Sequence, residues 1–186
     1  VVTSLLADQD EKEYFSLTDS NDLTRKEDLF IDFHASDQQH LGMAISFRQT
    51  LLTTFLLYQG LSWMGDDVGD YFSKMEKSKV LRKNMDKPFR MLGDIECYIW
   101  DEKKGDWHFV QRIHETGPIA KNLQVIIFPE QLISIGQPVR VKLTMARGLW
   151  RVDYVGLTAI KEKVTPHKVT LSKLVSLKKI NNHSVD

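Results

Sequence analysis

The sequence contains a single cysteine, Cys97, and no excess of charge of either sign. One cysteine excludes an intrachain disulfide, and its place in the strand-like run DIECYIW predicts a buried, inert thiol. Lysine plus arginine and aspartate plus glutamate both number 25, so no net charge draws nucleic acid to the whole surface. We therefore expect no nucleic-acid partner.

The motifs of common enzyme classes are also missing. The sequence contains no G-x-S-x-G, no G-x-x-x-x-G-K-[ST] and no G-x-G-x-x-G, and its six histidines follow no zinc-site spacing. The run DSND (19–22) resembles a fragment of a calcium loop, but it lacks the glycine and the closing glutamate. We expect an acidic turn there, with a structural calcium ion left open. We expect no enzyme activity, no cofactor and no catalytic metal.

The longest apolar run extends from Leu51 to Met64 and is interrupted by threonine, glutamine, glycine and serine. A membrane span needs about 20 predominantly apolar residues, so we expect none in this fragment. Apolar residues cover nearly the whole surface of this segment as a helix, which predicts a buried helix. A second, amphipathic helix follows Asp66-Asp67. Together they predict a helical insertion at about residues 49–82.

On both sides of the insertion, apolar residues mostly alternate with polar ones, as in half-buried strands. The alternation predicts eight strands, at residues 14–18, 29–33, 43–47, 95–100, 107–113, 123–128, 139–145 and 149–160. Turn residues at 101–106 and 146–148 predict two hairpins. Strands follow strands without βαβ alternation, which favours antiparallel sheets.

We therefore expect a mainly β fold, an antiparallel β-sandwich of the jelly-roll kind, over residues 1–160. Residues 161–186 are rich in lysine and are separated from the sandwich by Thr165-Pro166. This segment is expected to be a basic tail or a linker to a further segment.

Two tryptophans near strand ends are candidate ligand-binding residues. Trp107 opens a strand beside a charged turn, and Trp150 opens the last strand shortly after Arg147. An aromatic ring beside a charged side chain at a strand end suits sugar binding, because the ring stacks on the sugar while the charge meets its hydroxyls. The alternative is that both rings fill the sandwich interior. Trp63 and Trp100 lie in apolar surroundings and are expected in the core.

Arg48 and Asp153 are two further candidates. Arg48 lies where the third strand passes into the apolar helix, and a guanidinium there has to be solvated or paired. Asp153 is an acid inside an otherwise apolar strand and is its candidate partner. The two residues form either a structural ion pair or a polar anchor in a ligand cavity.

The final strands, VRVKLTMARGLWRVDYVGLTAI (139–160), resemble the closing strands of galactose-binding-like jelly-roll domains. The segment ETGPIA (115–120) followed by LQVIIF (123–128), and the segment ISFRQTLLTTFLLYQGLSWMG (45–65), are similar to uncharacterised Bacteroidetes surface proteins or lipoproteins. The resemblance covers most of residues 5–160. It implies a galactose-binding-like fold and a cell-envelope setting, periplasmic or surface-anchored, and it brings no catalytic residues.

These observations favour a non-catalytic ligand-binding module of a larger protein, with carbohydrate as the candidate ligand near Trp107, Arg147 and Trp150. The alternative is a structural or interaction scaffold, whose helices and tail contact another part of the parent protein. A scaffold predicts an exposed apolar patch of roughly several hundred Å² around the helices. An enzyme, the third hypothesis, predicts a cleft with paired titratable groups.

Overall fold

The computed structural model describes residues 6–10, 12–34, 37, 40–84, 93–114 and 120–161. Their helices include α2 (Leu51–Met64) and α3 (Val68–Lys77), which are joined by a 3-10 turn, Gly65–Asp67. The strands are β1 (Tyr14–Phe15), β2 (Lys26–Phe33), β3 (Leu41–Gln49), β4 (Ile95–Asp101), β5 (Asp106–Ile113), β6 (Asn122–Ile127), β7 (Val139–Ala146) and β8 (Trp150–Ala159). Eight strands and a helical insertion are present as predicted, although β1 ends at Phe15 rather than at residue 18, and the tail beyond Lys161 lies outside the described residues.

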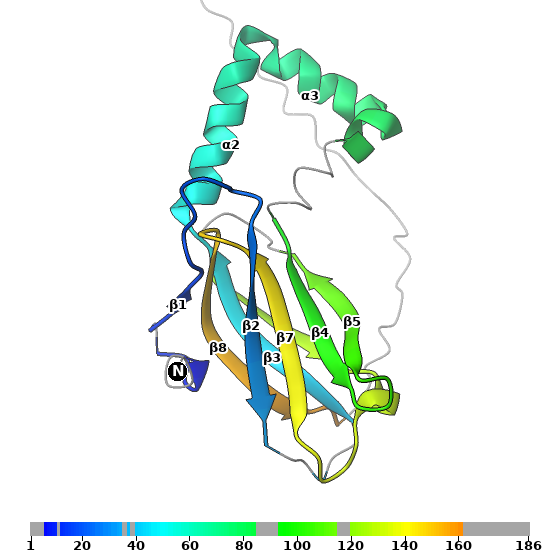
Figure 1. Cartoon of the computed structure of the whole chain (residues 1–186). Coiled ribbons are helices and arrows are strands. Elements are labelled where there is room, and N and C mark those ends of the chain that lie inside the picture. The colour runs from blue at the N-terminus through cyan, green and yellow to red at the C-terminus, as the bar shows by residue number, and fades with distance from the viewer. Residues whose placement is uncertain are drawn as a thin grey trace, which may run out of the picture.

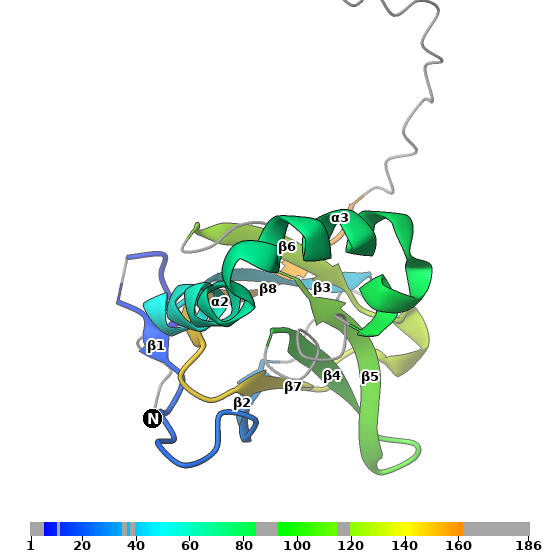
Figure 2. The same ribbon diagram turned by 90° about the horizontal axis from the view of Figure 1, so that it is seen from above.

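The strands form two four-stranded antiparallel sheets. Sheet A has the order β1-β8-β3-β6, and sheet B has the order β2-β7-β4-β5. Sheet B lies in front of sheet A in Figure 1, and the view from above in Figure 2 shows the two sheets facing each other. This sandwich-like arrangement agrees with the predicted mainly β architecture.

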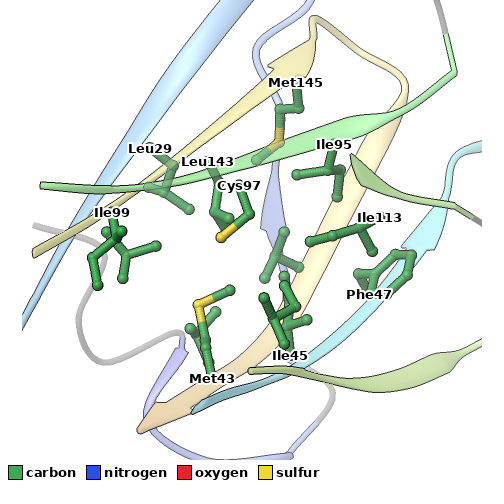
Figure 3. Packing of buried hydrophobic residues seen from close by; sticks show 14 of the residues in the cluster. Leu29, Met43, Ile45, Phe47, Ile95, Cys97, Ile99, Ile113, Leu143 and Met145 are labelled. Carbon is green, nitrogen blue, oxygen red and sulfur yellow. The ribbon is translucent and has the colours of Figure 1, made fainter. Parts of the chain in front are cut away.

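One hydrophobic core lies between the sheets. Figure 3 shows Met43 of β3 directed toward Cys97 and Leu143 of sheet B, and Phe47 of β3 beside Ile113 of the same sheet B. The alternation of buried and half-buried positions along β4 explains this, because a strand turns every second side chain to the same face. Cys97 is buried as predicted, and burial raises the pKa of its thiol to about 12.

One of the two predicted hairpins exists. β4 and β5 pair through the turn at 101–106, where Gly105 has a φ of 64°. The predicted hairpin of the last two strands is wrong, because β7 belongs to sheet B and β8 to sheet A. The short turn around Gly148 therefore carries the chain from one sheet to the other, and each strand pairs with partners distant in sequence.

Helix α2 departs most clearly from the sequence-based expectation, since none of its residues is buried. Only Leu52 and Leu56 pack against the core, and the rest of the helix runs away from the sheets beyond the end of β3 (Figure 1). Trp63, expected in the core, is 85% exposed. The apolar pattern predicted that other parts of the protein bury this helix, but the described residues leave most of its surface exposed.

Candidate functional site

Aromatic side chains gather on the outer face of sheet B, the face turned away from sheet A. They are Phe30 on β2, Tyr98 and Trp100 on β4, and Trp107 and Phe109 on β5, and we call them the aromatic patch. Phe30 is 60% exposed and Phe109 is 45% exposed, whereas the other three are half-buried. This face is toward the viewer in Figure 1, where neither α2 nor α3 crosses it.

The strand register aligns part of the patch in a row across the sheet. Phe30 lies opposite Lys142 of β7, Lys142 lies opposite Tyr98, and Tyr98 lies opposite Phe109. Side chains directly opposite each other on neighbouring strands have Cβ atoms about 5 Å apart, so they contact one another. The row therefore joins all four strands of sheet B.

A β-bulge in β5 turns Trp107 and Phe109 onto this face. The register between β4 and β5 shifts at Tyr98, which lies opposite Phe109 while the preceding residue lies opposite Gln111. Val110 is therefore the extra residue. Strict alternation from the buried end of β5 would point Trp107 and Phe109 into the core. Bulges near binding sites commonly re-aim side chains in this way.

Trp107 lies at the centre of the patch. Its ring centroid is 5.7 Å from that of Phe30 and 5.3 Å from that of Trp100, with interplanar angles of 48° and 70°. Tyr98 and Phe109 form a similar edge contact, 5.6 Å between centroids at 70°. Tilted and edge-to-face pairs contribute about 0.5–1.5 kcal/mol each beyond the area they bury. These contacts hold the rings in place before any ligand arrives.

Lys142 places a positive charge among the rings. Its Nζ lies 4.5 Å from the Tyr98 ring centroid and 5.2 Å from the Trp107 ring centroid. In the part of the chain that the structure describes, Lys142 forms no ion pair with a carboxylate. Cation–π contacts of this kind stabilise by about 0.5–1 kcal/mol at exposed sites.

Glu96 forms a polar cluster at one end of the patch. Its carboxylate accepts a hydrogen bond from Tyr98 Oη at 2.9 Å, and it lies 3.2 Å from Arg112 Nη2 and 3.7 Å from Lys26 Nζ. Burial alone would raise the pKa of Glu96, but the Tyr98 hydrogen bond and the charges of Lys26 and Arg112 outweigh it and lower that pKa. The Glu96 carboxylate is therefore ionised, and its charge is already matched.

A small pocket borders the other end of the patch. Its lining combines apolar residues, Ile99, Trp100, Leu132, Pro138 and Val139, with the polar residues Glu102, Ser134, Gln137 and Arg140. Arg140 Nη2 lies 3.9 Å from Glu102 Oε1, and both side chains are about half exposed, so the pair holds them only weakly. These groups offer hydrogen-bond donors and acceptors beside an aromatic ring.

Trp107 and Arg147, predicted to share one site, lie at opposite ends of sheet B. Ile99, next to the β4–β5 turn, lies opposite Val141 near the start of β7, whereas Arg147 follows the end of β7. The Arg147 backbone N–H donates to the Arg25 carbonyl at 2.9 Å. The Arg147 side chain pairs with Asp19 at 3.5 Å, at the end of the sheet far from the aromatic patch, so Arg147 and Trp107 do not share one site.

Trp150 belongs to the core rather than to a loop-end site. Its side chain is fully buried, and its ring centroid lies 5.8 Å from that of Phe47. Its backbone N–H donates to Ser16 Oγ at 3.0 Å. No face of the indole is open to a ligand, which corresponds to the alternative interpretation of this residue. Trp100, in contrast, was expected in the core and lies half-buried on the outer face.

Arg48 pairs with Glu13, a residue that the sequence analysis did not single out. Arg48 Nε and Nη2 donate to the two carboxylate oxygens of Glu13 at 2.6 and 2.7 Å, and Arg151 Nη1 donates to Oε2 at 3.3 Å. The Glu13 side chain is only 3% exposed. Strand alternation does not reveal such a partner, because Glu13 precedes β1 and reaches β3 and β8 only in the folded chain.

Asp153 is a buried bulge residue in β8. The register between β3 and β8 shifts there, since Ser46 lies opposite Tyr154 and Phe47 lies opposite Val152. The Asp153 carboxylate accepts a hydrogen bond from Ser46 Oγ at 3.4 Å, and the residue is 1% exposed. Its environment is that of a structural acid on sheet A, away from the aromatic patch.

The acidic turn at 19–22 uses its carboxylates for internal contacts. Asp19 Oδ1 accepts the backbone N–H groups of Asn21 and Asp22 at 3.0 and 3.2 Å, and its Oδ2 pairs with Arg25 and Arg147 at 3.3 and 3.5 Å. Among the described residues, no three His, Cys, Asp or Glu side chains converge as metal ligands would. No helix in the described ranges has the length and apolarity to cross a membrane.

Taken together, the patch offers aromatic faces, one positive charge among them, and polar side chains at both ends. This combination suits binding of a ligand that has both apolar faces and hydroxyl or charged groups. No protein-family model, no curated protein and no solved structure matches this chain.

Proposed function

We propose that this chain is a non-catalytic ligand-binding module whose ligand is a glycan, within a larger cell-envelope protein. The aromatic patch carries the proposal. Sugar rings have C–H faces that pack on aromatic rings, and hydroxyls that need donors and acceptors. Trp107 and its neighbours supply the aromatic rings. Glu102, Gln137 and Arg140, beside Trp100, supply the hydrogen-bond donors and acceptors. The cell-envelope setting rests on the resemblance of the sequence alone.

The strand pairing supports a jelly-roll topology, and with it the galactose-binding-like fold that the sequence resembles. β1 pairs with β8, β2 with β7, β3 with β6 and β4 with β5, all antiparallel. A chain paired in this way is one long hairpin whose two arms wrap together into two sheets. Jelly rolls occur among lectin domains. A fold alone does not assign a function, so the proposal depends on the patch.

A glycan-array screen followed by calorimetric titration tests the proposal. We expect a saturable ligand whose binding falls at least about tenfold in Trp107→Ala, since loss of a stacking ring costs on the order of 1.4 kcal/mol or more. Trp63→Ala is the matched control, because Trp63 is the exposed tryptophan of helix α2. A folded sample that binds no glycan, or binding that survives Trp107→Ala, would overturn the proposal.

A second candidate function, an interaction scaffold, is favoured by the exposed apolar residues of helices α2 and α3. We call residues 51–77 the helical arm. Its exposed large apolar side chains are Leu51, Phe55, Leu57, Tyr58, Trp63 and Phe72. A contiguous exposed apolar surface commonly marks an interaction site. The occupant that we propose is another part of the parent protein, as the sequence analysis expected.

Photo-crosslinking in the full parent protein tests this second function. A crosslinking side chain at position 55 or 63 is expected to join the arm to another segment of the same protein. Position 104, exposed at the tip of the β4–β5 turn, is the control. Equal crosslinking from the arm and from position 104 would contradict a specific contact.

A further inference from the structure

We propose that the glycan held by the aromatic patch is acidic, and that Lys142 binds a sugar carboxylate. This inference rests on the proposed glycan-binding function and names the chemical class of its ligand. The observation behind it is the position of one cation in the middle of the patch.

Lys142 occupies the centre of the row that crosses sheet B. Phe30 lies on one side of it and Tyr98 on the other, in direct cross-strand register. Its Nζ is 5.2 Å from the centroid of the Trp107 ring. A sugar ring stacked on Trp107 therefore brings its substituents within reach of the Lys142 ammonium group.

The other cations of this face already have acidic partners. Lys26 and Arg112 lie within 3.7 and 3.2 Å of the Glu96 carboxylate. Arg140 lies 3.9 Å from Glu102 and is opposite Asp32 in the register. Lys142 differs, because within the described ranges it contacts two ring faces and no carboxylate. Among the described residues, Lys142 is thus the cation of the aromatic patch that has no ion pair with a carboxylate.

The chemistry of an ammonium group explains why a carboxylate suits this position. The group has three N–H donors, and aromatic faces are only weak acceptors for them. Hydrogen bonds between an ammonium and a carboxylate are roughly twice as strong as those between neutral groups. The half-buried setting of Lys142 also lessens the screening of its charge by water and salt. A uronic acid offers a carboxylate and a ring face in one residue.

The acidic groups of this face lie in the rows around Lys142 rather than against it. Asp28 accepts a hydrogen bond from Thr144 Oγ1 at 2.5 Å, and Glu96 is held by its three partners. Both belong to the row beyond Lys142, opposite Thr144 of β7. Because these carboxylates are already hydrogen-bonded, they leave the Lys142 position open to an anionic ligand.

Calorimetric titration with matched oligosaccharides tests the inference. The probes are oligosaccharides that contain galacturonate or glucuronate, and the same compounds with each carboxylate reduced to a primary alcohol. We expect the acidic form to bind at least about tenfold more tightly, with an affinity that falls as salt increases. Lys142→Met is expected to remove both the preference and the salt dependence, whereas Lys142→Arg is expected to keep them.

The control variant is Lys74→Met, which removes one positive charge from the last turn of helix α3 and should leave the preference intact. Urea unfolding of each variant separates loss of binding from loss of folding. Equal binding of acidic and reduced forms, or a preference that survives Lys142→Met, overturns the inference and leaves the glycan-binding function standing. If no glycan binds at all, both proposals fail.

Discussion

Trp107 and Phe30 come from the two opposite edge strands of sheet B, and their ring centroids lie 5.7 Å apart. The contact reaches over the two central strands, so the Trp107 ring lies across the middle of the sheet, near Lys142 of β7. Phe30 therefore limits the positions that the Trp107 indole ring can adopt.

Phe30→Ala is expected to weaken glycan binding by about threefold to tenfold. Without Phe30, the Trp107 ring has to be immobilised when the glycan binds, which costs about 0.5–1.5 kcal/mol. The affinity is measured by calorimetry, and the mobility of the Trp107 side chain by NMR relaxation of its assigned indole N–H. Phe15→Ala is the control, because Phe15, at 52% exposed, is a similarly exposed phenylalanine on the other sheet. Equal effects of the two variants would contradict a role for the Trp107 contact.

Trp150→Ala is expected to lower the free energy of unfolding by about 3–5 kcal/mol, because it removes a large buried side chain and leaves a cavity. Trp63→Ala is expected to change it by less than about 0.5 kcal/mol, since Trp63 is 85% exposed. Urea unfolding of both variants measures the difference. A small loss for Trp150→Ala would indicate that the ring is not part of the packed core.

Strand positions were predictable from the sequence because alternation at a period of two directly encodes one buried face per strand. Pairing was less accessible, as the predicted hairpin between the last two strands shows. A short turn is compatible with two neighbouring strands of one sheet or with a passage between sheets, and alternation does not distinguish them. The turn between β7 and β8 carries the chain from one sheet to the other.

The aromatic patch could be predicted only in part, through Trp107 and its place beside a turn. Phe30, Tyr98 and Lys142 join it because of cross-strand register, which one sequence does not reveal. The bulge at Val110 has a larger effect, because it moves the side chains of Trp107 and Phe109 from the core-facing side of sheet B to its outer face. The expected burial of helix α2 failed for a related reason, because an apolar pattern does not say which surface covers it.

Glu13→Gln is expected to lower the free energy of unfolding at pH 7 by about 1.5–3 kcal/mol, because Arg48 and Arg151 lose a charged acceptor. Burial alone would raise the pKa of Glu13, but the two arginines outweigh it and hold that pKa below its ordinary value of 4.5. The contribution of Glu13 is therefore complete above the unfolded-state pKa and is lost as the pH falls through the lower, folded-state pKa.

Urea unfolding of Glu13→Gln and the unsubstituted chain, at pH 7 and again well below pH 4.5, measures this dependence. The two free energies are expected to converge at the acidic pH, where Glu13 is protonated and resembles glutamine in charge. Glu102→Gln is the control, since its exposed pair with Arg140 spans 3.9 Å and should matter little at either pH. An unchanged gap at low pH would show that the carboxylate charge is not what stabilises this cluster.

Gly42→Ala and Gly60→Ala are expected to shift stability in opposite directions. A Cβ atom at Gly42 would lie 2.7 Å from the Ile126 carbonyl oxygen, which β6 holds in the sheet, so we expect a loss of about 1–3 kcal/mol. Gly60 lies inside helix α2 with no atom within 4 Å of such a Cβ, and alanine there favours the helix by about 0.5–1 kcal/mol.

The stabilisation of helix α2 by Gly60→Ala raises the free energy of global unfolding only if helix α2 unfolds together with the sheets. Leu52 and Leu56 pack against the core, so we expect such coupling and a higher urea midpoint for Gly60→Ala. In a Trp63→Phe background, far-ultraviolet circular dichroism reports mainly the helix, and the fluorescence of the remaining tryptophans, which all lie in strands, reports the sheets. If the variant shifts the first transition and not the second, the helical arm unfolds independently of the sheets, and the coupling through Leu52 and Leu56 is too weak to hold it.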